Sequence, residues 1–126
     1  MEIDQKTQFD SNNKLIHLLN ISNMSREQIF EILDLAETYV DNKQKRYSDL
    51  EGRTIASLFF EPSTRTKTTF ELASKRLSAD FINIDISNSS TLKGESIVDM
   101  IKTLEAMSCD MFIVRHSISG TPHYIA

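Results

Sequence analysis

The sequence predicts an α/β fold in which a parallel sheet has helices on both faces, in the order βαβαβ, preceded by an amphipathic helix. Three apolar runs of strand length, 54–60, 81–86 and 110–116, support this prediction. Segments with helical spacing of their apolar residues separate these runs. Because connections between parallel strands are right-handed in nearly all proteins, the hand of the unit is predicted as well.

The composition is that of an ordinary globular domain. The chain has 126 residues, of which 40% are hydrophobic and 25% charged, with 3 Gly and 2 Pro. This length suffices for one domain with its own core. A formal net charge of -4 gives the chain no overall attraction for a polyanion, so we expect no nucleic-acid partner.

The single cysteine excludes a disulfide framework. Cys109 lies in the apolar run 108–114, which predicts a buried and unreactive thiol. A metal site built from Cys109, His116 and His123 would have ligand spacings that fit no structural zinc pattern. We therefore expect no metal and no cofactor.

The first part of the chain is polar and shows no periodicity, so residues 1–14 are expected to form a flexible N-terminus. It has neither the basic start and apolar run of a signal peptide nor the Arg-rich pattern of a transit peptide. A cytoplasmic location is therefore expected. No apolar run approaches the roughly 18 residues that a membrane helix requires, and no membrane partner is expected.

The preceding helix is predicted from the residues that follow this segment. Ser25 and Gln28 form a capping box, in which each side chain serves a backbone N–H of the other residue. The apolar residues at helical spacing are Ile29, Ile32, Leu33, Ala36 and Val40. This pattern predicts an amphipathic helix that ends near Asp41. The basic cluster at 43–46 lies in a polar stretch and is interpreted as a solvated loop face.

The run 54–60 has no polar alternation, which is typical of a strand covered on both faces and predicts the central strand of the sheet. Ser63 or Thr64 is the expected N-cap of the helix behind it. The apolar positions expected to pack this helix are Phe70, Leu72, Ala73 and Leu77. The pattern then repeats, with a strand at 81–86, a polar loop at 87–95, a helix at 96–108 and a strand at 110–116.

Chemistry is concentrated in the segment FFEPSTRTK, residues 59–67. It places hydroxyls and the guanidinium of Arg65 at the junction where a buried strand becomes a helix. Free backbone N–H groups and the helix dipole favour an anion there, and an arginine adds a bidentate contact. In an open parallel sheet this junction also lies at the carboxyl edge, where ligands bind. The alternative is that Ser63 and Thr64 are ordinary caps with no ligand.

This segment, followed by TFELASKRL, resembles the carbamoyl phosphate signature of the aspartate and ornithine carbamoyltransferase family. The stretch SSTLKGESIVDMIKTLEAM is similar to the mobile loop and following helix of that family. The run MFIVRH is similar to its third strand, which ends in a ligand-binding arginine. Together the similarities extend from about Leu15 to the last residue.

The resemblance implies roles for six residues. Ser63, Thr64, Arg65 and Thr66 would bind the phosphate, with Thr66 also near the carbonyl oxygen, and Arg115 would reach both groups. Lys93 would come from the loop of a neighbouring subunit and contact carbamoyl phosphate and aspartate. The catalytic set implied by the resemblance is Arg65, Thr66, Lys93 and Arg115.

Three features favour the aspartate branch of the family over the ornithine branch. They are Glu61 and Pro62 before STRT, Lys93 before Gly94 and Glu95, and His116 after Arg115. The reaction implied is that of carbamoyl phosphate with L-aspartate to give N-carbamoyl-L-aspartate and phosphate, the committed step of de novo pyrimidine biosynthesis. The resemblance also implies a homotrimer of catalytic chains with shared active sites, to which regulatory chains or a dihydroorotase can attach.

Family members continue through the rest of this domain and into a second domain that binds aspartate. Residues 15–126 are therefore expected to be a partial, incomplete N-terminal carbamoyl-phosphate-binding domain, with the aspartate-binding domain absent and no turnover by these residues alone. Two further readings stay open: a part of an ornithine carbamoyltransferase, and a non-catalytic protein that binds carbamoyl phosphate or another anion.

Overall fold

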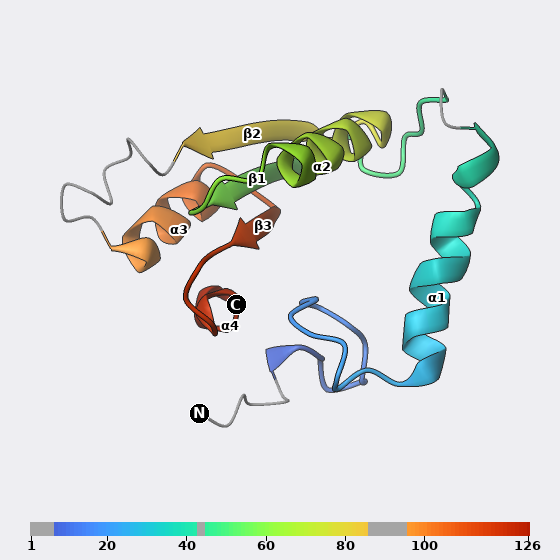
Figure 1. Cartoon of the computed structure of the whole chain (residues 1–126), viewed down its shortest axis with the longest axis horizontal. Helices are drawn as coiled ribbons and strands as arrows, with labels where there is room; N and C mark the ends of the chain where they lie inside the picture. Colours follow the sequence, from blue (N-terminus) through green and yellow to red (C-terminus); the bar gives the residue numbers. More distant parts are fainter. Residues whose placement is uncertain (1–6, 43–44, 86–95) are drawn as a thin grey trace. The chain divides into compact units, whose positions relative to one another are not determined.

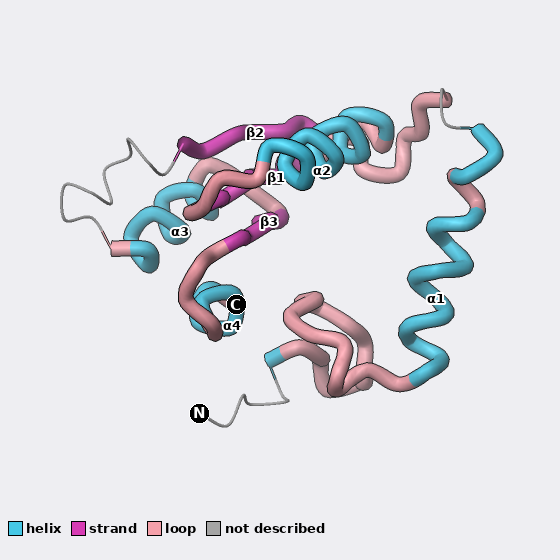
Figure 2. Tube along the Cα trace, in the orientation of Figure 1, coloured by secondary structure: helices cyan, strands magenta, loops and turns pink. Residues whose placement is uncertain are grey.

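The computed structural model of the chain describes residues 7–42, 45–85 and 96–126. It divides the chain into two compact units, an N-terminal one that reaches Lys45 and a second one from Arg46 to Ile125. The second unit contains the sheet, and Figure 2 shows its strands in magenta. Lys93 belongs to the segment 86–95 and lies outside the described residues.

The N-terminal unit contains helix α1, Arg26–Glu37, followed by the short 3-10 helix η2, Val40–Asn42. The predicted capping box is confirmed, because Gln28 N donates to Ser25 Oγ at 3.1 Å and Ser25 N donates to Gln28 Oε1 at 2.8 Å. The α-helix ends earlier than the predicted Asp41. The Thr38 hydroxyl donates to Leu35 O at 2.7 Å and the last turn tightens, which closes the helix after Glu37.

The apolar side of α1 is exposed. Within the described residues no side chain of α1 is buried. Of the predicted apolar positions, Ile32 and Leu33 have 40% and 55% of their surface exposed, and Ile29 is half-buried. The Arg26 guanidinium lies 5.2 Å from the centre of the Phe30 ring and covers part of it. The helix therefore has the amphipathic sequence pattern that was predicted, but nothing in the described residues buries its apolar side.

The segment before α1 is organised by one buried side chain, Gln8, which is 2% exposed. Its Oε1 accepts from Leu19 N at 2.8 Å and from Asn20 N at 3.0 Å, and its Nε2 donates to Asn20 O at 3.1 Å. Buried polar groups are stable when they are hydrogen-bonded in this way. Sequence reasoning did not single out Gln8, because the polar pattern of residues 1–14 carries no sign of such partners.

The sheet consists of β1, Thr54–Phe59, β2, Asp80–Asp85, and β3, Met111–Arg115. All pairs are parallel and the order is β2-β1-β3, so the prediction of a parallel sheet with the first strand at its centre is confirmed. At the carboxyl edge Phe59 aligns with Arg115 on one side. The last residues of β1 and β3 therefore lie next to each other.

Two longer helices connect the strands, α2, Thr64–Arg76, and α3, Ile97–Ala106. Side chains alternate between the faces of a strand, so Ala56 and Leu58 share one face of β1 and Ser57 points to the other. The core on the first face contains Ala56, Leu58, Met100, Ile101, Leu104 and Cys109. These include the buried side chains of α3, while α2 contacts β1 and β2 and buries Ser74. Helices thus cover both faces, as predicted (Figure 1).

Two packing predictions had different outcomes. Cys109 is buried, as predicted. Burial, and to a smaller extent the neighbouring Asp110 carboxylate, raises the pKa of the Cys109 thiol, which keeps it unreactive. The packing role predicted for Phe70, Leu72 and Ala73 is wrong within the described residues, because all three are exposed. The helix instead turns Ser74 toward the sheet, and the Ser74 hydroxyl is satisfied by Phe70 O at 2.7 Å.

The C-terminal end of α2 is held by the segment that leads into β1. Arg46 Nη1 donates to Lys75 O at 3.0 Å, and Tyr47 N donates to Arg76 O at 2.7 Å. The Ser78 hydroxyl donates to Tyr47 O at 2.6 Å. Arg46 is therefore a partner of the last helical carbonyls, where a cation is favoured, and more than part of a solvated loop.

After β3 the chain turns into the short helix α4, Thr121–Ile125. Gly120 precedes it with a φ of 88°, a conformation that glycine adopts without a steric penalty. Ile125 packs against the core on the α3 side of the sheet. None of the helices that the structure describes is both long and apolar enough to cross a membrane.

Candidate functional site

The strand order sets the directions in which the chain leaves the carboxyl edge of the sheet. From β1 the chain turns into α2 on one face, and from β3 it turns into α4 on the face that carries α3. The connections of these two neighbouring strands thus leave in opposite directions, which defines a topological switch point, where ligands of open parallel sheets bind. Two segments border it, the β1–α2 turn, residues 60–63, and the post-β3 segment, residues 116–120.

Arg115, the last residue of β3, joins these two segments. Its Nε donates to Glu61 Oε1 at 2.8 Å and its Nη1 donates to Ser63 Oγ at 2.9 Å. In addition, Phe60 N donates to Arg115 O at 2.8 Å, which continues the strand pairing by one hydrogen bond. The side chains of Arg115 and Glu61 are 45% and 35% exposed, so the ion pair is partly open to solvent. Such pairs contribute about 0.2–1 kcal/mol.

Ser63 occupies the N-cap position of α2 but does not cap the helix. Its backbone has a φ of -159° and a ψ of 73°, and within the described residues its side chain makes no hydrogen bond to the first helical turn. Its hydroxyl accepts from Arg115 instead. Of the two predicted caps, Ser63 therefore has the right position, while its side chain is committed to the edge of the sheet.

The first turn of α2 presents unsatisfied donors. The first helical hydrogen bond runs from Lys67 N to Ser63 O at 3.0 Å, so the N–H groups of Thr64, Arg65 and Thr66 precede it. Within the part of the chain that the structure describes, no hydrogen bond or ion pair engages the Arg65 guanidinium, and the residue is exposed. Free N–H groups, the positive end of the helix dipole and a free guanidinium together favour an anion.

Five of the six predicted site residues thus belong to one edge of the sheet. Ser63 and Arg115 are in direct contact, and the residues on the first turn of α2 that follow Ser63 are Thr64, Arg65 and Thr66. Of these three, Thr66 is half-buried and the other two are exposed. The sixth, Lys93, is among the residues that are not described. The two arginines at this edge are Arg65 and Arg115, with the carboxylate of Glu61 opposing the second, and Lys67 follows in the first turn of α2.

His116 has well-defined partners beside this site. Its ring packs on Phe60 with ring centres 4.6 Å apart and planes inclined by 50°. Its Nδ1 accepts a hydrogen bond from Ile118 N at 2.9 Å, so the imidazole is neutral there and carries its proton on Nε2. Sequence reasoning used Glu61 and His116 to separate branches of a family, considered His116 also in a metal set, and gave Phe60 no role of its own. Their mutual contacts were missed because they join segments far apart in the sequence.

The described residues contain no group of three or more His, Cys, Asp or Glu side chains that could hold a metal ion. The set considered from the sequence cannot converge around one ion. Cys109 precedes β3 and His116 follows it, so the strand separates them by roughly 20 Å at 3.3 Å per residue.

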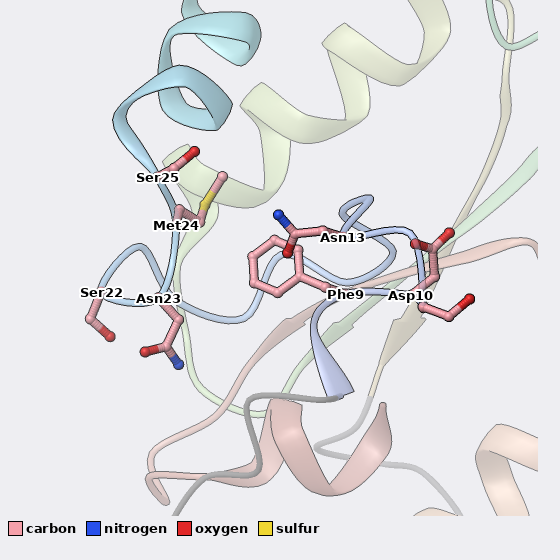
Figure 3. Close-up of a pocket in the computed structure, with 8 residues that line it drawn as sticks. Phe9, Asp10, Asn13, Ser22, Asn23, Met24 and Ser25 are labelled. Carbon is pink, nitrogen blue, oxygen red and sulfur yellow. The ribbon is translucent and has the colours of Figure 1, made fainter.

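A hollow within the N-terminal unit is lined by Phe9, Asp10, Ser11, Asn13, Ser22, Asn23, Met24 and Ser25. Figure 3 shows the last four of these along the segment that enters α1, with Phe9 and Asn13 close to each other. The Asp10 carboxylate is already used, because its Oδ1 accepts from Asn12 N and Lys14 N, both at 2.9 Å. The hollow therefore offers little free charge to a ligand, in contrast to the carboxyl edge of the sheet.

Residues 16–126 match the family profile described as aspartate/ornithine carbamoyltransferase, carbamoyl-P binding domain. This range includes the whole carboxyl edge described above.

Three solved structures show the similarity. The aspartate transcarbamoylase of Trypanosoma cruzi in complex with aspartate and phosphate has 29% identity and a TM-score of 0.75, over 86% of this chain and 36% of that one. The same enzyme in complex with carbamoyl phosphate and aspartate has 29% identity and a TM-score of 0.76, over 86% and 35%. The catalytic subunit of M. jannaschii aspartate transcarbamoylase has 34% identity and a TM-score of 0.75, over 87% and 38%.

The chain spans less than two fifths of the length of these structures. Within that span the α/β fold agrees with theirs, and the relatives are carbamoyltransferases, which are transferases. Profile, fold and the three sequence motifs therefore lead to the same assignment, and the chain belongs to the aspartate/ornithine carbamoyltransferase family, with residues 16–126 in its carbamoyl-phosphate binding domain.

Proposed function

We propose that this chain supplies the carbamoyl phosphate half-site of an aspartate carbamoyltransferase. The observation that carries the proposal is the contact between Arg115 and Ser63 at 2.9 Å, which brings an arginine of β3 to the uncapped first turn of α2. Backbone donors, hydroxyls and two arginines then lie at one edge of the sheet. This combination suits a small phosphate ester with a polar second group.

In this proposal the phosphate lies at the N-terminus of α2. It accepts from the free N–H groups of the first turn and from the hydroxyls of Ser63, Thr64 and Thr66. Arg65 adds charge-assisted hydrogen bonds. Arg115 is oriented between the phosphate and the carbonyl oxygen, with Thr66 near the latter. Solved complexes of the T. cruzi relative with carbamoyl phosphate and with phosphate support the choice of ligand.

The reaction is attack of the aspartate amino group on the carbamoyl carbon. The resulting tetrahedral intermediate expels phosphate and leaves N-carbamoyl-L-aspartate, so no covalent enzyme intermediate is required. The enzyme contributes by positioning two anionic substrates and by stabilising the charge that develops on the carbonyl and phosphate oxygens. Arg65 and Arg115 are the described arginines proposed to do so, and Lys93 is proposed to join them from a neighbouring subunit.

The remaining parts of the proposal concern the whole protein. We place the reaction at the committed step of de novo pyrimidine biosynthesis in the cytoplasm, in a homotrimer whose active sites are shared between chains. Regulatory chains or a dihydroorotase are compatible with such a trimer. Apart from Lys93, the residues that bind aspartate are proposed to lie outside residues 15–126, so that these residues alone form a half-site.

Two alternatives are distinguished by the second substrate. The family profile covers both aspartate and ornithine enzymes, and Glu61, Lys93 and His116 are the residues that favour aspartate. The native protein should form carbamoyl-aspartate from carbamoyl phosphate and aspartate, and no citrulline from ornithine. Citrulline as the main product would assign the chain to the ornithine branch. Phosphate binding without either product would leave a non-catalytic binder.

The assignment of the site is tested by Arg65→Ala. Loss of a charge partner of the reacting oxygens should reduce turnover by about 10² to 10³. The fold should be unchanged because the Arg65 side chain has no partner in the described part of the chain. Arg26→Ala is the matched control, since Arg26 lies on α1 and contacts only the Phe30 ring among the interactions described. Near-normal turnover in the Arg65 variant would refute the proposed phosphate site.

A further inference from the structure

Three contacts join the end of β3 and the post-β3 segment to the β1–α2 turn. The Phe60 N–H donates to Arg115 O at 2.8 Å, the Arg115 side chain bonds Glu61 and Ser63, and the His116 ring packs on Phe60. The first contact is backbone and the second is between exposed polar groups. The packing of the His116 ring on Phe60 is therefore the apolar contact among the three, and it lies directly beside Arg115.

His116 is also tied to the chain that follows it. Its Nδ1 accepts from the Ile118 N–H at 2.9 Å, two residues further on, in the geometry that an Asn or Asp side chain adopts in an Asx-turn. This bond fixes the ring orientation and the tautomer at the same time. The ring is thus held from the post-β3 segment and pressed against the β1–α2 turn.

Arg115 depends on this arrangement because it is the last residue of its strand. Beyond it the sheet provides no further pairing for β3, and the Arg115 side chain is 45% exposed. A long exposed side chain is ordered only when its backbone and its partners are fixed. Movement of the post-β3 segment away from Phe60 would carry Arg115 away from Ser63.

We propose that His116 is a positioning residue of the anion site: it holds the post-β3 segment against the β1–α2 turn so that Arg115 reaches Ser63. His116 acts through Arg115 and does not contact the anion. This inference rests on the proposed function, because it concerns the same anion site. It also explains why a neutral imidazole with an acceptor nitrogen suits this position, beyond its value as a filler of space.

The two contacts of His116 can be removed separately in the native protein. His116→Asn keeps an acceptor for Ile118 N–H through an Asx-turn and loses the ring, whereas His116→Phe keeps a ring on Phe60 and loses the acceptor. His116→Ala loses both. His17→Ala is the matched control, because His17 is an exposed histidine of the N-terminal unit. The readouts are the Kd of inorganic phosphate by calorimetry and hydrogen exchange of the Ile118 amide.

We expect His116→Ala to weaken phosphate binding about tenfold and to speed exchange at Ile118, while its melting temperature stays close to that of the unchanged protein. His116→Asn should restore the protection of Ile118, and His116→Asn and His116→Phe should each recover part of the affinity. His17→Ala should change neither readout. Recovery by two variants that keep different contacts is a result that simple loss of packing would not give.

Unchanged phosphate affinity in His116→Ala would overturn the inference, and so would tight binding in that variant despite an unprotected Ile118 amide. If His116→Ala does not fold, the affinities of His116→Asn and His116→Phe decide the question, and equal affinity to the unchanged protein in both overturns it. If Arg65→Ala abolishes phosphate binding and the His116 variants do not, the proposed function stands and only this inference fails. Absence of phosphate binding by the unchanged protein removes both.

Discussion

At the scale of the residue, the candidate site combines attraction and restraint. The charge of Arg115 is neutralised in part by Glu61, at 2.8 Å, while the Arg65 guanidinium has no partner among the described residues. The two arginines therefore differ in what an incoming anion must do. Arg65 is ready to bind, whereas Arg115 exchanges part of its interaction with a carboxylate for one with the ligand.

Glu61→Gln should consequently raise the affinity for inorganic phosphate. The substitution keeps the shape and an acceptor for Arg115 Nε but removes the competing charge. Because exposed pairs contribute about 0.2–1 kcal/mol, the gain should reach at most about fivefold in Kd, measured by calorimetry at low salt. The control is Glu71→Gln, which removes the carboxylate of the ion pair between Glu71 and Lys75 on α2. Weaker binding in Glu61→Gln would mean that Glu61 orients Arg115 more than it opposes the ligand.

Ser57 shows a different use of a polar residue. It is 1% exposed in the middle of β1, and its hydroxyl has no hydrogen-bond partner in the described part of the chain. An unsatisfied buried hydroxyl costs about 1–3 kcal/mol relative to a satisfied one. Ser57→Ala should therefore leave the free energy of unfolding unchanged or raise it by about 1 kcal/mol, measured by urea denaturation. Ser74→Ala is the comparison, since Ser74 has a partner in Phe70 O, and a loss in Ser57→Ala alone would contradict the argument.

At the scale of the element, the neighbouring strands β1 and β3 are joined at both ends by side chains. At the carboxyl edge the fastening is Arg115 with Glu61 and Ser63. At the opposite edge Asp110 precedes β3, accepts from Thr54 N at 2.9 Å through Oδ2 and pairs with Arg53 at 3.3 Å. The backbone bond to Thr54, helped by Arg53, lowers the pKa of the Asp110 carboxyl below its usual range.

This lowered pKa predicts a pH dependence of stability. A carboxyl whose pKa is lower in the folded protein stabilises the fold above its unfolded pKa, and the contribution is lost as the pH falls through the folded value. The stability difference between the unchanged protein and Asp110→Asn should thus be constant near neutral pH and shrink below about pH 4. Denaturation in urea at a series of pH values measures it. A difference that does not change with pH would show that the hydrogen bond to Thr54 matters and the charge does not.

At the scale of the whole molecule, the described residues contain one half of the proposed reaction site. Arg65 and Arg115 belong to the described edge, and Lys93 is proposed to act from a neighbouring subunit. A shared site has a consequence that a site within one chain lacks, because defects in different chains can be complemented.

Mixtures of Lys93→Ala and Arg65→Ala chains, dissociated and reassembled, should therefore recover activity that neither variant has alone. If chains assemble at random in the proposed trimer, some interfaces combine an intact Lys93 with an intact Arg65. The recovered activity should then be a sizeable fraction of that of the unchanged enzyme. The measurement is carbamoyl-aspartate formation as a function of the mixing ratio. Activity that never exceeds the sum of the two variants would place Lys93 and Arg65 in the same chain.

The fold was predictable because its signals are local. Strands 54–60, 81–86 and 110–116 and the capping box at Ser25 depend on neighbouring residues, and the structure agrees to within one or two residues at their ends. The contacts within the site were not predictable from the residues themselves, because Arg115 and Glu61 are 54 positions apart. The exposure of Phe70 and Leu72 was missed for a similar reason, since helical spacing indicates an apolar side but not what covers it.

The commitment of the Ser63 hydroxyl to Arg115 has a thermodynamic consequence for α2. A helix whose N-cap side chain is used elsewhere is weakest in its first turn, and an anion on the N–H groups of Thr64, Arg65 and Thr66 would act as the cap that the sequence does not provide. Binding of an anion at the first turn of α2 and order in that turn are then coupled. A ligand at one hundred times its Kd adds about 2.7 kcal/mol to the stability of the folded protein. Substrate would in that case complete the helix to which it binds.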